Sequence, residues 1–239
     1  MGWLGTVARD EVTRPWRSAF PAGTLASGTP GRARLLEVSV GLFAARGYNG
    51  VSVRDLGDAL GAKPSSLYAH FESKDELFGY LVLVANEQIH RSLLEAIASA
   101  NPDPASTLRA IVHAYVKWHA TYPALGTVGH SDLHALSDVS LSAVAELRKQ
   151  TIDLFLDAIR RGNESGDFSC ARPWLAVAAL AGMGIRVSHW YRPPAQPVES
   201  VIDTYAVTMQ QWVPPVSIDD LTEEYVLYAL AIVRAAPRG

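Results

Sequence analysis

The segment between Ser52 and Phe71 constrains the fold of this chain more than any other feature. Ser52 and Asp55 have the spacing of a capping box, which predicts a helix N-terminus, and Gly61 is suited to end that helix. Pro64 then suits the first position of another helix, because its missing N–H is not needed there. Two short helices joined by a turn of about four residues predict a helix-turn-helix, a shape that fits a DNA major groove.

Helical patterns on both sides support this segment. Before it, apolar residues at helical spacing predict a helix from Gly31 to Gly47, with Gly47 in the left-handed conformation. After it, Ser73 and Glu76 form a second predicted capping box, which opens a long helix of roughly 40 Å. We therefore expect a three-helix helix-turn-helix domain over residues 31–82.

The remainder of the chain is also helical in pattern. Its expected helices are separated by prolines or glycines: Asp103 to Tyr122, Leu141 to a turn at Gly162–Gly166, Pro173 to about Trp190, Val198 to Val213 and Leu221 to Ala235. The sequence contains no convincing strand and no repeat. We expect an all-α fold in which a C-terminal helical domain over 83–239 follows the helix-turn-helix. Residues 1–30 mix prolines, glycines and aromatics without a period, which predicts a disordered arm.

Charge and composition bound the possible functions. The formal charge is −3 and the hydrophobic content is 49%, which suit a globular protein whose DNA contacts would have to be local. The single cysteine, Cys170, excludes an intrachain disulfide and agrees with a reducing cytoplasm. The longest apolar stretch, Leu175 to Val187, falls short of the ~20 residues of a membrane helix, and no secretory signal is evident. We expect a cytoplasmic protein without membrane contact.

Small polar and basic side chains surround the predicted turn. Ser65 and Ser66 lie on the outer face of the helix that begins at Pro64, where their short side chains can read base edges. The residues expected to contact phosphate are Ser52, Arg54, Lys63, Tyr68, His70 and Lys74. On geometry alone, a small three-helix bundle with ordinary surface charges is an equal alternative.

The run from Ser52 to Leu77 closely resembles the DNA-binding domain of the TetR family. The motifs that carry this resemblance are Leu67-Tyr68-x-His70-Phe71 and Ser73-Lys74-x-Glu76-Leu77, within a match from Gly31 to about Val82. The resemblance implies contacts with the DNA backbone by Tyr68, the His70 region and Lys74. The chain departs from the family at Lys63, where Ser or Thr is usual as a cap. We therefore expect a poorly capped helix there and an additional phosphate contact.

The same resemblance implies a homodimer in which two recognition helices read a palindromic operator in successive major grooves. The helix over 173–190 and the one over 197–213 are the expected four-helix interface. Residues 83–239 would then form a ligand-binding and dimerisation domain, without a cofactor. We expect a DNA-binding transcriptional regulator, a repressor that a small-molecule effector releases from its operator by shifting the population of conformations.

Aromatic and polar side chains of the second domain are the candidate effector contacts: Trp118, Tyr122, His130, Arg186 and Trp190. Burial in the core or an interface is the favoured alternative for most of them, because aromatic side chains dominate ordinary burial. The segment from Arg186 to Pro194 resembles the acyl-CoA-responsive branch of the family, which includes repressors of sterol and fatty-acid catabolism. This implies that Arg186 and Trp190 contact coenzyme A; an intersubunit salt bridge beside a packed tryptophan is an equal alternative.

His130 and His134 have the spacing of two metal ligands on one helical turn. Two histidines that face solvent or a pocket are the favoured interpretation, because no cysteine or carboxylate cluster completes a site, so no metal is expected. The chain has no nucleophile elbow, phosphate-binding loop or dinucleotide fingerprint, so we expect no catalytic residues and no enzyme. The alternative from another functional class is an all-helical small-molecule carrier or enzyme that retains a vestigial helix-turn-helix.

Overall fold

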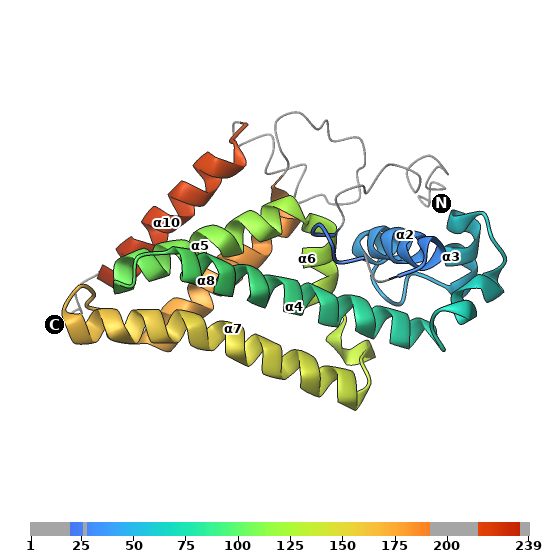
Figure 1. Cartoon of the computed structure of the whole chain (residues 1–239), viewed down its shortest axis with the longest axis horizontal. Helices are drawn as coiled ribbons and strands as arrows, with labels where there is room; N and C mark the ends of the chain where they lie inside the picture. Colours follow the sequence, from blue (N-terminus) through green and yellow to red (C-terminus); the bar gives the residue numbers. More distant parts are fainter. Residues whose placement is uncertain (1–19, 26–27, 192–214, 235–239) are drawn as a thin grey trace, which may run out of the picture.

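Residues 20–25, 28–191 and 215–234 are described by the computed structural model, and every element within them is helical (Figure 1). The α-helices are α2 (Pro30–Arg46), α3 (Val53–Leu60), α4 (Lys74–Ser99), α5 (Pro104–Thr121), α6 (Pro123–His130), α7 (Asp138–Ser165), α8 (Pro173–Trp190) and α10 (Ile218–Arg234). Two 3-10 helices are η1 (Pro64–Ala69) and η2 (Leu133–Ala135). The expected all-α fold is confirmed. Most of the expected arm over 1–30 and the expected helix over 198–213 lie outside the described residues.

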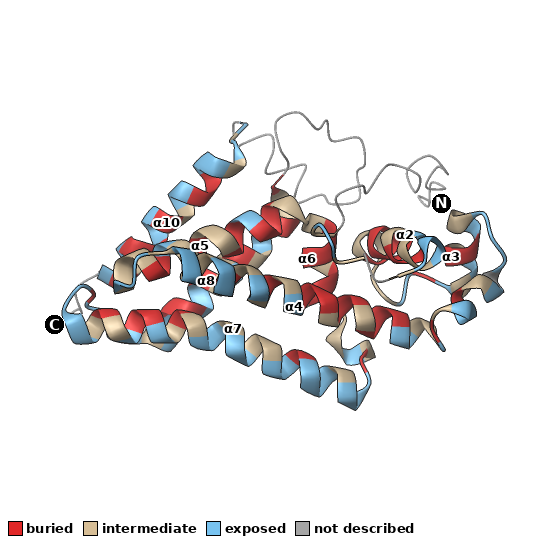
Figure 2. Cartoon of the chain, in the orientation of Figure 1, coloured by how far each residue is buried: buried red, intermediate tan, exposed pale blue. Residues whose placement is uncertain are grey.

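The long helix α4 connects the two parts of the molecule. Its beginning lies beside the helix-turn-helix of α2, α3 and η1, and its remainder packs against α5 and α7 (Figure 1). α6 packs against α2, α4 and α8, so it touches both parts. α10 covers α5, and the outer side of α7 is largely exposed (Figure 2). No helix within the described ranges is at once long and apolar enough to cross a bilayer.

Side-chain caps fix where the helices begin. Ser52 Oγ accepts the Asp55 N–H, and the Asp55 carboxylate accepts the Ser52 N–H at 2.7 Å, so the first expected capping box is confirmed. Ser73 caps α4 by accepting the Glu76 N–H at 3.0 Å. The Glu76 carboxylate, however, reaches one residue past the cap and accepts from the Glu72 N–H. The second expected capping box is therefore confirmed for the bond from the Glu76 N–H to Ser73 and wrong for the bond from the Ser73 N–H to Glu76. Each such cap stabilises a helix by ~1 kcal/mol.

The glycines at helix ends behave differently from one another. Gly61 ends α3 in the left-handed conformation, as expected, with φ 64° and ψ 29°. Gly47 has φ 68° but ψ 171°, so the left-handed conformation expected for it is wrong. α7 runs through Gly162 to Ser165 and ends at Gly166 in the left-handed conformation, so the turn expected over Gly162–Gly166 is wrong at its first residue and confirmed at its last. A Cβ at Gly162 would lie 2.0 Å from the Phe168 ring, so this glycine makes room for Phe168.

Candidate nucleic-acid interface and effector site

Buried side chains hold η1 on the helix-turn-helix. Leu67 and Phe71 are 2% and 4% exposed, as their spacing predicted. The Arg32 guanidinium of α2 lies 5.0 Å from the Phe71 ring centre and 4.4 Å from that of Tyr80 on α4. Such cation–π contacts stabilise by ~0.5–1 kcal/mol each at exposed sites. Arg32 therefore ties three elements together, a role that its position in the sequence did not reveal.

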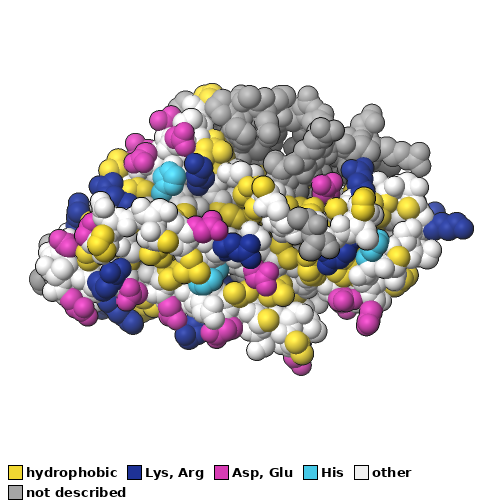
Figure 3. Space-filling model, in the orientation of Figure 1, with side chains coloured by type: hydrophobic (Ala, Val, Ile, Leu, Met, Phe, Trp, Pro, Cys, Tyr) yellow, Lys and Arg dark blue, Asp and Glu magenta, His cyan; other side chains and the backbone are white. Residues whose placement is uncertain are grey.

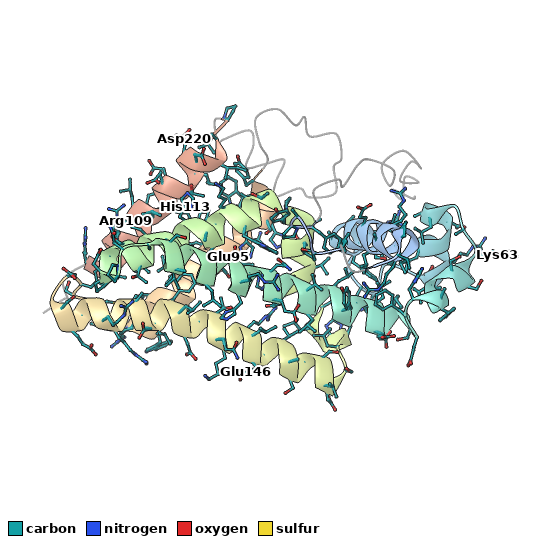
Figure 4. The ribbon with its side chains drawn as sticks, viewed as in Figure 1. Lys63, Glu95, Arg109, His113, Glu146 and Asp220 are labelled. Carbon is teal, nitrogen blue, oxygen red and sulfur yellow. The ribbon has the colours of Figure 1, made fainter. Side chains whose placement is uncertain are left out.

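The outer face of η1 carries side chains expected to meet DNA. η1 is a 3-10 helix of six residues, so residues three apart lie above one another and Ser65 shares a side with Tyr68. Tyr68 is 58% exposed and Ser65 is exposed, while Ser66 and His70 are half-buried. Lys63 makes no side-chain cap, as expected, and points away from the body of the molecule (Figure 4). This face is accessible to a DNA groove.

Arg54 and Ser52 mark the beginning of α3. Arg54 is exposed and lies 3.9 Å from Asp58. Surface ion pairs of this kind contribute little to the stability of the fold. The Ser52 hydroxyl is hydrogen-bonded to the Asp55 carboxylate. This bond and the one from the Ser52 N–H hold the pKa of Asp55 below its ordinary value. A phosphate contact at Ser52 would therefore use the helix N-terminus rather than the hydroxyl.

Lys74 begins α4, and its ammonium group turns toward the preceding turn. Nζ donates to Tyr48 O at 3.0 Å and to Val51 O at 2.9 Å, and lies 3.8 Å from the Tyr48 ring centre. Because an ammonium group carries only three protons, little donor capacity remains for a DNA phosphate. The Tyr48 hydroxyl donates to the Asp75 carboxylate, and burial together with this bond raises the pKa of Tyr48 to about 12.

A hydrogen bond at Tyr48 also joins the helix-turn-helix to the second domain. The Tyr48 N–H donates to Asp132 Oδ2 at 2.9 Å. Asp132 follows α6 and has the left-handed conformation, with φ 48° and ψ 33°, which aspartate tolerates better than most residues. α6 itself packs against α2. α6 and Asp132 therefore contact the helix-turn-helix at α2 and at the turn between α2 and α3.

Three of the five expected effector residues lie close together. Trp118 is 5% exposed, and its ring centre lies 5.6 Å from that of Tyr122 and 5.2 Å from that of His119. His119 in turn approaches His130, with 3.3 Å between their Nε2 atoms. The indole Nε1 of Trp118 is buried and has no hydrogen-bond partner among residues 20–25, 28–191 and 215–234. Trp118 is therefore packed in the core, while its indole N–H remains able to donate a hydrogen bond.

Arg186 and Trp190 lie on α8, which packs against α5 and α6. Arg186 is exposed, and Trp190 is half-buried with its ring centre 6.0 Å from that of Tyr191. The buried side of α8 touches the first group, because Ser188 Oγ donates to His119 O at 3.3 Å. The five residues proposed for the effector therefore do not share one environment.

His119 and His130 form a buried pair whose proton positions follow from their partners. His119 Nδ1 lies 2.8 Å from the Tyr115 carbonyl and must carry the proton of that bond, so its Nε2 accepts from His130. Both rings are neutral in this arrangement. Burial lowers the pKa of His119 to about 4 and that of His130 well below its ordinary value.

Arg148 of α7 continues this network, which sequence reasoning missed. It donates to His130 Nδ1 at 3.3 Å, to Gly129 O at 2.7 Å and to Asn86 Oδ1 at 3.1 Å. Asn86 is 4% exposed within the apolar face of α4. The sequence signal that could have revealed this network is Asn86, a polar residue at a position of the helical pattern that is otherwise buried and apolar.

His130 and His134 do not lie on one helical turn, as their spacing had suggested. His130 ends α6, whereas His134 lies in η2 and is exposed. The left-handed Asp132 separates them. Within the ranges that the structure describes, no three His, Cys, Asp or Glu side chains form a potential metal site.

Two family models match the chain. The one described as bacterial regulatory proteins, tetR family, matches residues 35–81, and the one described as tetracyclin repressor-like, C-terminal domain, matches residues 101–213. The chain belongs to the TetR family. The family and the DNA-binding helix-turn-helix expected from the motifs around Tyr68 and Lys74 are thus confirmed.

Other TetR-family proteins agree with this membership. The HTH-type transcriptional repressor KstR2 of Rhodococcus jostii is 28% identical over 175 residues, which are 72% of this chain and 85% of that repressor. A tetR-family regulatory protein from Rhodococcus RHA1 has a TM-score of 0.72 at 25% identity, covering 88% of this chain and 100% of the other. AibR, solved with isovaleryl coenzyme A and operator DNA, shares the fold with a TM-score of 0.66 at 16% identity, covering 85% and 97%. The chain is therefore a transcriptional regulator of this family, with repressors among its relatives.

Proposed function

We propose that this chain is a cytoplasmic, homodimeric repressor that binds a palindromic operator and is released from it by a small-molecule effector. The observation that carries the proposal is the hydrogen bond from Tyr48 N–H to Asp132 Oδ2, because it joins the DNA-binding element to the domain that would hold the effector. DNase I footprinting of the region upstream of the chain's own gene tests it, and a protected palindrome is expected. Turnover of a thioester without a footprint would instead favour the carrier or enzyme alternative.

At the DNA, Ser65 and Ser66 would read base edges while the surrounding side chains hold phosphates. The proposed phosphate contacts are the side chains of Arg54, Lys63, Tyr68 and His70, the helix N-terminus at Ser52, and the donor capacity of Lys74 that its bonds to Tyr48 and Val51 leave. On the face of the molecule in Figure 3, basic and acidic side chains are interspersed, in keeping with a net charge of −3. Attraction for DNA would therefore come from this local set rather than from the charge of the whole protein.

In the dimer, α8 would supply one helix of each subunit to a four-helix interface; the expected helix over 197–213 lies outside the described residues. Trp174 and Leu175 of α8 are 63% and 43% exposed. Gly182 is exposed two turns after Leu175, and a Cβ there would meet no atom of the described residues within 4 Å. Gly182→Leu should therefore preserve the fold and weaken dimerisation in sedimentation experiments. Unchanged sedimentation would place the interface elsewhere.

The effector would be an acyl-CoA thioester. Support comes from the resemblance of the segment that begins at Arg186 and from AibR, a protein of the same fold solved with isovaleryl coenzyme A. Arg186 is exposed and can meet a phosphate, and Trp190 one turn further along can meet an adenine or acyl surface. Native mass spectrometry of protein purified from its own cells should show a bound acyl-CoA.

Substitution of Arg186 distinguishes a contact with the effector from a salt bridge between subunits. Arg186→Ala should abolish effector-driven release and leave operator binding intact. Lost dimerisation would instead support an intersubunit salt bridge.

Release would follow from a population shift. The effector would favour a position of α6 in which Asp132 no longer holds Tyr48 as DNA binding requires. The recognition elements of two subunits would then lose the spacing of successive major grooves. Because allosteric coupling is reciprocal, operator DNA should weaken effector binding by the same factor as the effector weakens DNA binding.

A further inference from the structure

Arg148 is a half-buried cation whose hydrogen-bond acceptors are all uncharged. Its Nε donates to Asn86 Oδ1, and its Nη2 donates to Gly129 O and to His130 Nδ1. Within the described part of the chain no carboxylate forms an ion pair with its guanidinium. Burial lowers the pKa of Arg148, which reflects the cost of holding the charge there. A charge in such a position ordinarily has an anionic partner.

The neighbouring histidines do not change this charge. His119 donates from Nδ1 to the Tyr115 carbonyl, and His130 accepts at Nδ1 from Arg148. Their two Nε2 atoms, 3.3 Å apart, bond to each other. Both rings are neutral and use both nitrogens within the protein. Of Arg148, His119 and His130, only Arg148 carries a charge; His189 of α8 lies near enough to act on the pKa of both histidines.

Tyr115 of α5 supplies another polar group where α5 packs against α7, the helix that carries Arg148. The side chain is 4% exposed, and its ring packs edge-on against Phe155 of α7 with centres 5.5 Å apart. Burial raises the pKa of Tyr115, and the nearby charge of Arg148 opposes part of that rise. Within the described residues, neither the Tyr115 hydroxyl nor Arg148 Nη1 has a hydrogen-bond partner. Neither atom is among the fully buried groups that lack a partner, so a small solute can reach both donors.

We propose that Arg148 Nη1 and the Tyr115 hydroxyl bind a carboxylate of the effector. This deepens the proposed function and rests on it, because it takes the second domain to hold the effector. A carboxylate has two oxygens, one for each donor, and a single charge that matches one guanidinium. A phosphate carries about −1.5 to −2 charges and would need a second cation. An acyl-CoA effector would thus carry a carboxylate on its acyl group, with its phosphates elsewhere.

The test compares an acid with its amide on the full-length protein without DNA. Octanoate and octanamide are matched in length and differ in charge, and isothermal titration calorimetry measures the affinity of each. Butanoate and dodecanoate with their amides cover other lengths. The acid is expected to bind about tenfold more tightly than the amide. The proposal would be overturned if, at all three chain lengths, the protein bound the acid and the amide equally or bound neither.

Three variants assign the preference to residues. Tyr115→Phe should weaken octanoate binding about tenfold and leave octanamide binding and stability unchanged, because the lost hydroxyl has no partner among the residues that the structure describes. Arg148→Met should abolish octanoate binding, although it also removes three internal hydrogen bonds. Arg160→Met, at an exposed position of the same helix, is the matched control and should change nothing.

Two outcomes would overturn the assignment. One is octanoate binding that is unchanged in Tyr115→Phe. The other is loss of coenzyme A binding in Arg148→Met with octanoate binding retained, which would indicate a phosphate site. A wild-type protein that fails to bind operator DNA would contradict the proposed function and leave these calorimetric results standing.

Discussion

The helix-turn-helix and the interior of the second domain place their polar groups in opposite ways. Around η1 they are exposed, and the capping bonds are local, as between Ser52 and Asp55. Between α5 and α7 they are buried and bond across the chain, as Arg148 does with Asn86. An exposed set suits a large, charged partner that approaches from outside. A buried set with unused donors suits a small solute that replaces their missing acceptors.

The two regions should also respond to different variables. Contacts with DNA phosphates weaken as salt rises, because binding releases counterions. The buried network responds instead to pH through His119, whose neutral form the fold requires. The two regions meet at Tyr48 and Asp132.

The largest expected effect is loss of stability of the second domain in acid. Burial lowers the pKa of His119 from 6.5 to about 4. The unfolded chain therefore takes up this proton first as the pH falls. The stability that depends on neutral His119 is complete above pH 6.5 and is lost by about pH 4. At about 1.4 kcal/mol per pKa unit, the loss is about 3 kcal/mol.

Urea unfolding at about pH 7.5 and about pH 4.5 measures this loss. His119→Gln should show a smaller drop in the free energy of unfolding between these pH values than the wild type. His134→Gln, at an exposed histidine, should match the wild type. Equal pH dependence in the wild type and His119→Gln would contradict a buried, neutral histidine.

The next effect is on the helix-turn-helix, at Lys74. Lys74→Met removes the bonds from Nζ to the Tyr48 and Val51 carbonyls. Because bonds to charged groups contribute about 1.5–3 kcal/mol, the free energy of unfolding should fall by about 2 kcal/mol. Lys149→Met removes an exposed lysine paired with Asp153 and should change stability little. Equal stability of the two variants would show that Lys74 is not a structural anchor.

DNA binding should distinguish two kinds of contact on the outer face of η1. Tyr68→Ala should weaken binding to operator and random duplexes alike, by about tenfold, because a phosphate contact carries no sequence information. Ser65→Ala should change preference among operators with little effect on random DNA. Fluorescence anisotropy titrations measure both. If both variants affected both duplexes equally, the division between phosphate and base contacts would be wrong.

The smallest effect concerns the link between the regions. Asp132→Gly keeps the left-handed conformation but removes the acceptor for the Tyr48 N–H. Loss of one hydrogen bond of about 1 kcal/mol should speed hydrogen exchange at the Tyr48 amide about fivefold. Asp132→Asn keeps both the conformation and an acceptor oxygen, so exchange should stay near that of the wild type. Identical exchange in the Gly and Asn variants would show that the side chain does not hold Tyr48.

The helix-turn-helix could be predicted closely because its determinants are local. Ser52 with Asp55 and the glycine at 61 act within one or two turns, and the inward positions of Leu67 and Phe71 follow from their spacing. What escaped prediction there depends on residues distant in sequence. Arg32, for instance, contacts Tyr80, which lies on another helix.

The second domain was predicted only as a set of helices. Its helices often begin at prolines, which are local signals. Gly162 was predicted to lie in a turn, but it lies within a helix and makes room for the Phe168 ring, a contact that sequence spacing does not reveal. Arg148 and Tyr115 come together only when α5 and α7 pack, so no motif marks them. The site residues proposed on sequence remain predictions, and the packing adds this pair to them.

The most direct test of the account is the affinity of the full-length protein for a duplex from upstream of its own gene, measured by anisotropy over a range of salt. The account predicts tighter binding to this duplex than to a scrambled one. It also predicts a logarithm of affinity that falls linearly with the logarithm of salt concentration. Equal affinity for the two duplexes at every salt concentration would contradict it.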